Sequence, residues 1–255
     1  MKNLYALIFI MLMSVATLMA QETEMITDRP DQTESAYLVP KGWVQGETGF
    51  VYEKFSSQVK NYAYNTSLVR YGMLENLELR FGFSYLGSKV KTTEFSDREN
   101  GLGPLSFGFK TVIAREDGAL PQLAFLSTLT LPNTGSNAFD TDHLGADFRL
   151  TMEYSINESM TFGANFGTAW SGMEGEDYET LLYTLVVGMK VSERISGFGE
   201  LYGFFPGKGS NDHRWDMGLT HKVTENFQLD LSFGIGLNDT APDHFLSGGF
   251  SIRIP

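Results

Sequence analysis

Apolar and polar residues alternate with a period of two along most of the chain after residue 40, and the spacing typical of helices is nearly absent there. In the stretch 77–85, Leu, Leu, Phe, Phe and Tyr alternate with Glu, Arg, Gly and Ser. Successive side chains of a β-strand point to opposite faces, so each such strand has one apolar and one polar face. The pattern therefore predicts an all-β protein.

Runs of this alternation, bounded by turn residues, predict twelve strands. The expected ranges are 42–54, 60–71, 77–87, 102–114, 120–131, 143–156, 159–170, 178–191, 194–206, 212–223, 226–237 and 244–254. Strands of a globular sheet usually have about five or six residues, whereas tilted membrane strands need about 9–11. Strand length and the even strand number favour an antiparallel transmembrane β-barrel over a soluble β-sandwich.

The connections between these strands alternate in length. Short joins are expected at 72–76, 115–119, 157–158, 192–193 and 224–225, and longer ones at 55–59, 88–101, 132–142, 171–177, 207–211 and 238–243. Short turns at one end and longer loops at the other are typical of transmembrane barrels. We expect the last strand to pair with the first, because closure removes the sheet edges that lipid does not tolerate.

The cost of burying charge in lipid decides which face points outward. The apolar series must meet the lipid, and the polar series must line the lumen. We expect a charged lumen wall of both signs, made of Glu78, Arg80, Lys110, Asp147, Arg149, Glu153, Asp216 and Asp230. Aromatic residues near the predicted strand ends suggest girdles at the two membrane boundaries: Tyr52, Tyr71, Tyr85, Tyr154, Trp170, Tyr178, Tyr202 and Trp215.

The first twenty residues have the pattern of a secretory signal peptide. Lys2 is followed by an almost uninterrupted apolar run from residue 4 to residue 18, and polarity begins abruptly after Ala20. We expect cleavage after Ala20, with an uncleaved membrane anchor as the alternative. The organisation expected is a signal peptide at 1–20, an N-terminal periplasmic segment or plug at 21–41 and an outer-membrane barrel at 42–255.

Composition narrows the function classes. The chain of 255 residues has no Cys, which excludes disulfides, thiolate metal sites and cysteine catalysis. Its net charge of −12 and the lack of Lys/Arg clusters argue against a nucleic-acid partner. With 42% hydrophobic residues it is not a disordered chain.

The stretch before the first predicted strand is rich in charge and irregular. Asp28, Arg29, Asp31 and Glu34 could fold into the barrel mouth, where Arg70, Arg80 or Arg149 would pair with the carboxylates. That arrangement would make residues 21–41 a plug or gate. The alternative is a solvated tail, because chain ends are usually mobile unless they are tied down.

Two blocks of sequence resemble a known family. The stretch Thr27-Asp28-Arg29-Pro30-Asp31-Gln32-Thr33-Glu34-Ser35 with Val39-Pro40-Lys41-Gly42, and the stretch Arg70-Tyr71-Gly72-Met73-Leu74-Glu75-Asn76-Leu77-Glu78-Leu79-Arg80, are similar to segments of an outer-membrane transporter family named for the meta-pathway of phenol degradation. The resemblance, closest to Bacteroidetes-type members, implies an outer-membrane barrel that passes small organic molecules.

Three of the four histidines follow an aspartate where a long loop enters a strand. These pairs, Asp142-His143, Asp212-His213 and Asp243-His244, are weak candidates for a rim metal site, with repeated hairpin turns as the simpler interpretation. The fourth histidine, His221, is expected to face lipid and belongs to no recognisable catalytic motif. We therefore expect no enzyme activity and no cofactor.

The function expected from the sequence is an outer-membrane β-barrel channel or transporter of a Gram-negative bacterium. Its solutes would be small, with aromatic or hydrophobic molecules as candidates, and its partners would be outer-membrane lipid, the solute and the barrel-assembly machinery. One alternative is a closed structural or binding barrel whose acidic outer stretches, 97–99 and 174–177, meet a partner or divalent ions. A rim lipid hydrolase is the less favoured alternative.

Overall fold

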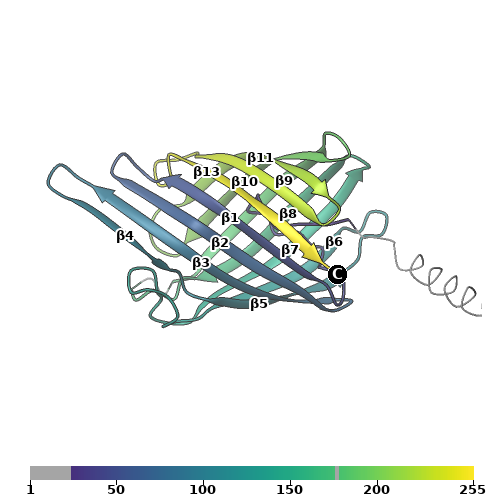
Figure 1. Ribbon diagram of the computed structural model, residues 1–255, viewed down its shortest axis with the longest axis horizontal. Coiled ribbons are helices and arrows are strands. Elements are labelled where there is room, and N and C mark those ends of the chain that lie inside the picture. The colour runs from purple at the N-terminus through teal and green to yellow at the C-terminus, as the bar shows by residue number, and fades with distance from the viewer. Residues whose placement is uncertain (1–23, 176–177) are drawn as a thin grey trace, which may run out of the picture.

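The computed structural model describes residues 24–175 and 178–255, and the predicted signal peptide lies outside the described residues. The described residues form long antiparallel strands that run obliquely around the molecule (Figure 1). Their bounds are β1 Val44–Lys54, β2 Val59–Leu74, β3 Leu77–Lys91, β4 Ser96–Leu102, β5 Ser106–Ala114, β6 Gln122–Thr130, β7 Gly145–Asn157, β8 Met160–Trp170, β9 Thr180–Lys190, β10 Ile195–Pro206, β11 Asp212–Thr224, β12 Phe227–Gly236 and β13 His244–Ile254. Within these residues, no helix is long and apolar enough to cross a membrane.

The sheet closes on itself as a twelve-stranded antiparallel barrel. β4 and β5 count as one barrel strand, because both pair with β3: Tyr85 lies opposite Leu102, and Gly82 lies opposite Ser106. β13 pairs with β1 along their whole length, from Val44 opposite Ile254 onward. The predicted fold and its closure by the last strand are therefore confirmed.

The prediction that residues 88–101 form a long loop is wrong. β3 continues to Lys91, and β4 returns from Ser96, so most of this stretch is a β-hairpin that projects beyond its neighbours (Figure 1). Polar residues occupy both faces there, so the alternation that reveals lipid-facing strands is absent. The acidic stretch 97–99 consequently lies within β4, and residues 176–177 of the other acidic stretch lie outside the described residues.

The two faces of the barrel differ as the alternation predicts. In β11, Met217 and Leu219 are about half exposed on the outside, whereas Asp216, on the lumen face of the same strand, is fully buried. Tyr202 corrects one expectation: its ring is 2% exposed inside the lumen and is not part of an outer girdle. Its neighbour Leu201, 44% exposed, takes the outward position, because successive side chains of a strand point to opposite faces.

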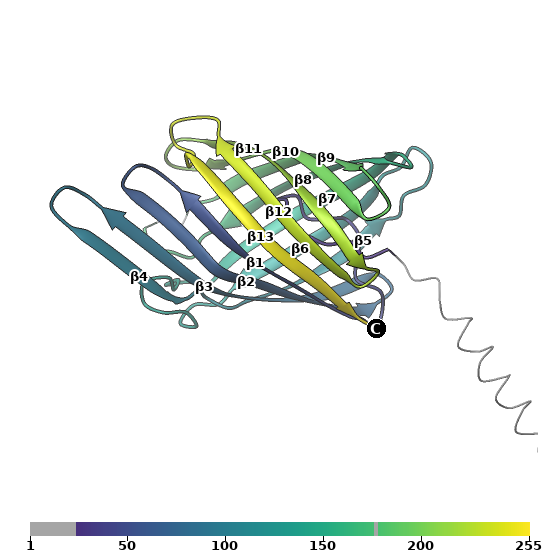
Figure 2. The same cartoon turned by 45° about the horizontal axis from the view of Figure 1, so that its top comes forward.

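Residues 24–41, called the N-terminal segment below, cross the interior of the barrel. Figure 2 shows this segment enclosed by the strands. Its residues bond to opposite parts of the wall, with Val39 held by Glu78 of β3 and Thr33 held by Glu200 of β10. The segment therefore spans the lumen, and its side chains and those of the wall form the polar core of the molecule.

Candidate functional site

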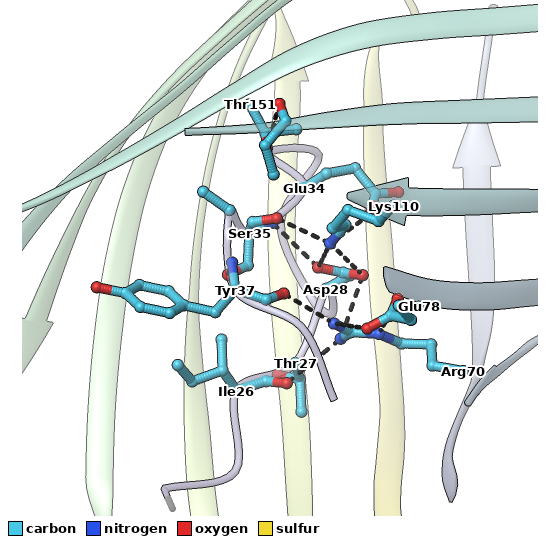
Figure 3. A network of polar contacts seen from close by, with 12 residues as sticks. Ile26, Thr27, Asp28, Glu34, Ser35, Tyr37, Arg70, Glu78, Lys110 and Thr151 are labelled. Atoms are coloured by element: carbon cyan, nitrogen blue, oxygen red, sulfur yellow. Dashed lines mark hydrogen bonds and ion pairs between the residues drawn. The ribbon is translucent and has the colours of Figure 1, made fainter. Parts of the chain in front are cut away.

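Asp28 is the centre of a buried ionic network in the lumen (Figure 3). Its carboxylate accepts hydrogen bonds from Arg80 Nη1 at 2.6 Å and from Lys110 Nζ at 3.0 and 3.1 Å. Arg70 Nη1 lies 3.2 Å away, and the backbone N–H of Ser35 donates at 3.0 Å. Cations from β2, β3 and β5 thus converge on one aspartate of the N-terminal segment.

Two wall glutamates hold the two arginines in place. Arg70 Nε and Nη2 donate to Glu78 at 2.9 and 3.0 Å, and Arg70 Nη1 donates to Glu47 at 2.8 Å. Arg80 is shared between Glu78, at 3.0 Å, and Glu34 of the segment, at 2.8 Å. Pairing of this density allows the charges to remain ionised although the Arg70, Glu47 and Glu78 side chains are fully buried.

The backbone of the N-terminal segment is also satisfied by side chains of the wall. Glu47 Oε2 accepts the N–H groups of Asp28 and Arg29, both at 3.0 Å. Asn165 uses both ends of its amide on Glu34, accepting from its N–H at 2.7 Å and donating to its carbonyl at 2.9 Å. Irregular backbone is tolerated at membrane depth only where protein or water provides such partners. These contacts therefore fix the segment by its main chain as well as by its charges.

Arg29 is held at the junction of the first and last strands. Its guanidinium donates to Asp230 Oδ1 at 2.9 Å and to Ser247 Oγ at 3.1 Å. It fills the space beside Gly49 and Gly249, where a Cβ on Gly249 would lie 2.7 Å from Arg29 Nε. Any side chain at either glycine would overlap the arginine.

Asp31 faces the opposite, acidic part of the wall. Glu200 of β10 and Asp216 of β11 lie directly opposite each other in register, and both approach Asp31. Glu200 accepts from the Gln32 N–H at 2.8 Å and from the Thr33 hydroxyl at 2.5 Å. The Asp216 carboxylate is buried and has no hydrogen-bond donor among the described residues.

The pKa values of the two aspartates of the segment are consequently shifted in opposite directions. Burial by itself would raise the pKa of Asp28, but the charges of Arg70, Lys110 and Arg80 lower this pKa well below its usual range. Burial and then the negative charge of Glu200 raise the pKa of Asp31 well above its usual range. Asp28 is therefore an ionised anchor, and Asp31 is a carboxyl that keeps its proton far more readily.

The structure places every residue of the expected charged wall on the lumen side. Glu78, Arg80 and Lys110 belong to the Asp28 network, and Asp230 binds Arg29. The others line other parts of the lumen: Glu153 accepts from Ser35 Oγ at 2.9 Å, Arg149 pairs with Asp147 at 2.9 Å, and Asp216 faces Glu200. Two carboxylates of the segment, Asp28 and Glu34, bind Arg80. Asp28 also pairs with Arg70, which donates to the carbonyls of Ile26 and Tyr37 as well.

Sequence reasoning missed Glu47 and Glu200, which bind the segment most directly. Glu47 was missed because Gly46 and Gly49 interrupt the apolar series of the first strand. Glu200 was missed because apolar and polar residues alternate poorly along β10. Gln45 was also missed, although its Nε2 donates to the carbonyl of Ile26 at 2.9 Å. The usable signal was the two-residue spacing of Gln45, Glu47 and Gly49, which puts all three on the lumen face.

The three Asp-His pairs are not brought together. Asp212 binds Arg214, Asp243 binds Lys54, and Asp142 accepts from the backbone N–H of Glu174. In the part of the chain that the structure describes, no group of three or more His, Asp or Glu side chains is placed to hold a metal ion. Each of the three aspartates therefore has its own partner within the protein.

Cavities lie on both sides of the N-terminal segment. On the side of the long loops, one of about 460 Å³ is lined by hydroxyls together with Arg80 and Arg149. Another there, of about 300 Å³, is lined by Tyr202, Phe204 and Arg214. On the side of the short turns, cavities of about 560 and 300 Å³ adjoin the same segment. The segment thus lies between cavities at the loop end and cavities at the turn end of the lumen.

Comparisons with known proteins agree with this architecture. The model of a family described as "Putative MetA-pathway of phenol degradation" matches residues 27–254. No curated protein matches the chain.

Solved structures of similar shape are outer-membrane barrels. The COG4313 outer membrane channel from Pseudomonas putida F1 is 15% identical, with a TM-score of 0.68 over 85% of this chain and 97% of that one. The KdgM porin is 11% identical, with a TM-score of 0.53 over 83% of this chain and 99% of that one. The translocator domain of the autotransporter NalP from Neisseria meningitidis is 11% identical, with a TM-score of 0.53 over 82% and 87%. At these identities the similarity establishes the fold.

Proposed function

The chain belongs to the family of the MetA pathway of phenol degradation, and from this premise we propose that it is an outer-membrane channel for small solutes whose N-terminal segment is a plug. The barrel lies in the outer membrane, and its lumen is the route of the solute. No covalent chemistry is required. The segment and the charged wall decide when the route is open and what passes.

The observation that carries this proposal is the way the segment is held. Its contacts to the wall are ion pairs and hydrogen bonds between separate parts of the chain, with cavities on either side. A barrel that was only structural would be more stable with a packed apolar core, because buried ion pairs often contribute little net stability. A polar, cavity-flanked plug can instead separate from its wall and leave both surfaces hydrated.

The solutes that we propose are small aromatic or otherwise apolar molecules. Tyr202 and Phe204 point into the lumen beside Phe245, and the Arg214 guanidinium lies about 6 Å from both of the first two rings. Aromatic faces and a guanidinium bind a ring with a polar substituent through stacking and hydrogen bonding. The wider cavity beside Arg80 and Arg149 would admit such molecules from the loop side.

A disulfide lock tests the plug directly. The hydroxyls of Thr33 in the segment and Thr184 in β9 are 2.7 Å apart, and the chain has no native Cys. The double variant Thr33→Cys/Thr184→Cys would join segment and wall with little displacement. Single-channel conductance in planar bilayers would be recorded before and after reduction, with Thr33→Cys alone as the control.

We expect the oxidised double variant to be silent and to regain conductance when reduced. The single-cysteine control should not respond to reductant. Equal conductance in the oxidised and reduced states would show that solutes pass beside a fixed segment. Silence of the reduced variant and of the unmodified protein would favour the closed binding or structural barrel.

A further inference from the structure

Four basic residues form a row across four adjacent strands at the loop end of the barrel. Lys54 of β1 lies directly opposite Lys60 of β2, and Lys60 lies directly opposite Lys89 of β3. Lys89 in turn lies directly opposite Arg98 of β4. These four residues, called the basic row, belong to the hairpins that project furthest in Figure 1. Like charges placed directly opposite on neighbouring strands destabilise a sheet unless an anion neutralises them.

Among the described residues, the two ends of the basic row have polar partners, and the partner of Lys54 is a carboxylate. Lys54 pairs with Asp243 at 2.8 Å, and Arg98 donates to the Tyr64 hydroxyl at 2.7 Å. For the central residues, Lys60 and Lys89, the described part of the chain provides no ion pair. What distinguishes these two lysines is that they lie directly opposite each other on neighbouring strands. Both ammonium groups are therefore free to bind an anion from outside the protein.

A group of tyrosines lies directly below the basic row, on the same outward face. Tyr52 and Tyr62 have ring centroids 5.5 Å apart, Tyr62 and Tyr64 are stacked at 5.5 Å, and Tyr85 lies 5.9 Å from Tyr64. Lys54 and Lys60 are each two residues beyond a tyrosine of this group, a rise of about 7 Å along the strand. Tyrosines of this kind lie at the level of lipid head groups. The basic row therefore lies at the level of the head groups or just above it.

Acidic residues of the same hairpin are on its other face. Glu99 lies opposite Ser88, and Asp97 lies opposite Val90, so both alternate with Lys89 and Arg98 and point away from the basic row. Outward positions near the loop ends of other strands hold Leu181 and Phe205 instead. Positive charge on the lipid side is thus concentrated on β1–β4.

We propose that the basic row binds the phosphate groups of lipid A, the phosphorylated glycolipid of the outer leaflet. The phosphate would lie between Lys60 and Lys89, the sugar would contact the tyrosine group, and the acyl chains would follow the apolar outer wall below it. Lysine ammonium groups bind phosphate as point charges, and basic clusters at a membrane surface select anionic head groups. This site depends on the outer-membrane location and not on conduction, so it is independent of the plug.

The test measures lipid A binding to the purified protein by native mass spectrometry in detergent. Lys60→Gln/Lys89→Gln would be compared with Lys41→Gln/Lys190→Gln, which makes the same charge change at the turn end of the barrel. Lys60→Arg/Lys89→Arg keeps the charge and should keep the binding. Heat-modifiable migration on gels would verify that each variant is a folded barrel.

We expect the dissociation constant for lipid A to rise about thirtyfold in Lys60→Gln/Lys89→Gln and to stay unchanged in the turn-end control. Dephosphorylated lipid A should bind the unmodified protein as weakly as lipid A binds the double variant. Undiminished binding by the double variant or of dephosphorylated lipid A would overturn the site. Equal affinity for phosphatidylglycerol would overturn the assignment to lipid A and leave a general anionic-lipid surface.

Discussion

Gly49 of β1 and Gly249 of β13 lie directly opposite each other, and the space left by their missing side chains holds the guanidinium of Arg29. The strand pair that closes the barrel is therefore also a docking point of the N-terminal segment. Asp230 and Ser247 complete this pocket from neighbouring positions on β12 and β13. The same few residues therefore close the barrel and bind the N-terminal segment.

Gly49→Val should displace the Arg29 side chain without changing any charge. The new side chain would occupy the space of the guanidinium, and overpacking of this kind costs about 1–3 kcal/mol. We expect a higher open probability in planar bilayers and a lower unfolding temperature. Gly46→Ala is the matched control on the same strand, because its Cβ would meet only Ile252 Cγ2, at 3.8 Å. Identical conductance in the two variants would contradict a role for Arg29 in holding the plug.

Asp28→Asn should be much more damaging than Asp147→Asn. The first change leaves Arg70, Arg80 and Lys110 buried around a neutral amide, at a cost of about 3–5 kcal/mol. The second removes a partly exposed pair with Arg149 and should cost about 1 kcal/mol or less. Urea unfolding of both variants in detergent gives the two free energies. Similar losses would mean that the Asp28 network is not the main anchor.

Docking of the segment should weaken as pH rises. The raised pKa of Asp31 means that its neutral form stabilises the docked state, fully below the unfolded-state value of about 3.9. That contribution is lost as pH rises through the folded-state pKa, where ionised Asp31 meets Glu200, Asp216 and the negative charge of Asp28. The anchor at Asp28 behaves oppositely, because its lowered pKa keeps it ionised until strongly acidic pH.

Single-channel recordings between pH 5 and pH 9 would measure this effect. Open probability should increase on the alkaline side, by at most about tenfold per pH unit for one proton. Asp216→Asn removes one of the carboxylates that raise the pKa of Asp31, so the alkaline increase in open probability should be smaller and should end at lower pH. It should also raise stability, because a buried carboxylate without a donor is replaced by a neutral group. A flat pH profile in the unmodified protein would disprove the titration.

Arg149→Gln should change ion preference while leaving the barrel intact. Arg149 is 18% exposed and lines the loop-side cavity of about 460 Å³, where its partners among the described residues include Asp147 and the Gln32 carbonyl. Its neutralisation should shift reversal potentials toward cation selectivity, with little change in unfolding temperature. Glu78→Gln would not be an equivalent probe, because Glu78 holds both Arg70 and Arg80. An unchanged reversal potential would remove Arg149 from the selectivity wall.

Much of the architecture follows from local pattern. Alternation in stretches such as 77–85 and 226–237 predicted the strands and their facing, because one face of each must meet lipid. The hairpin at 88–101 escaped prediction, because it extends beyond the lipid and has no apolar face. Tyr202 was assigned to a girdle for a related reason, since a ring facing a lumen and a ring facing lipid look alike in sequence.

The sequence by itself determined the barrel, its outward face, its charged wall and the unusual charge density of residues 28–34. Those properties depend on a two-residue period and on the cost of charge in hydrocarbon, both of which are local. Only the tertiary structure decided which carboxylate meets which cation. Asp28 and Asp31 are three residues apart, yet one lies among Arg70, Arg80 and Lys110 and the other beside Glu200 and Asp216. Barrel closure brings strands that are distant in sequence around one short segment. The charges of these strands shift the pKa values of two chemically identical side chains in opposite directions.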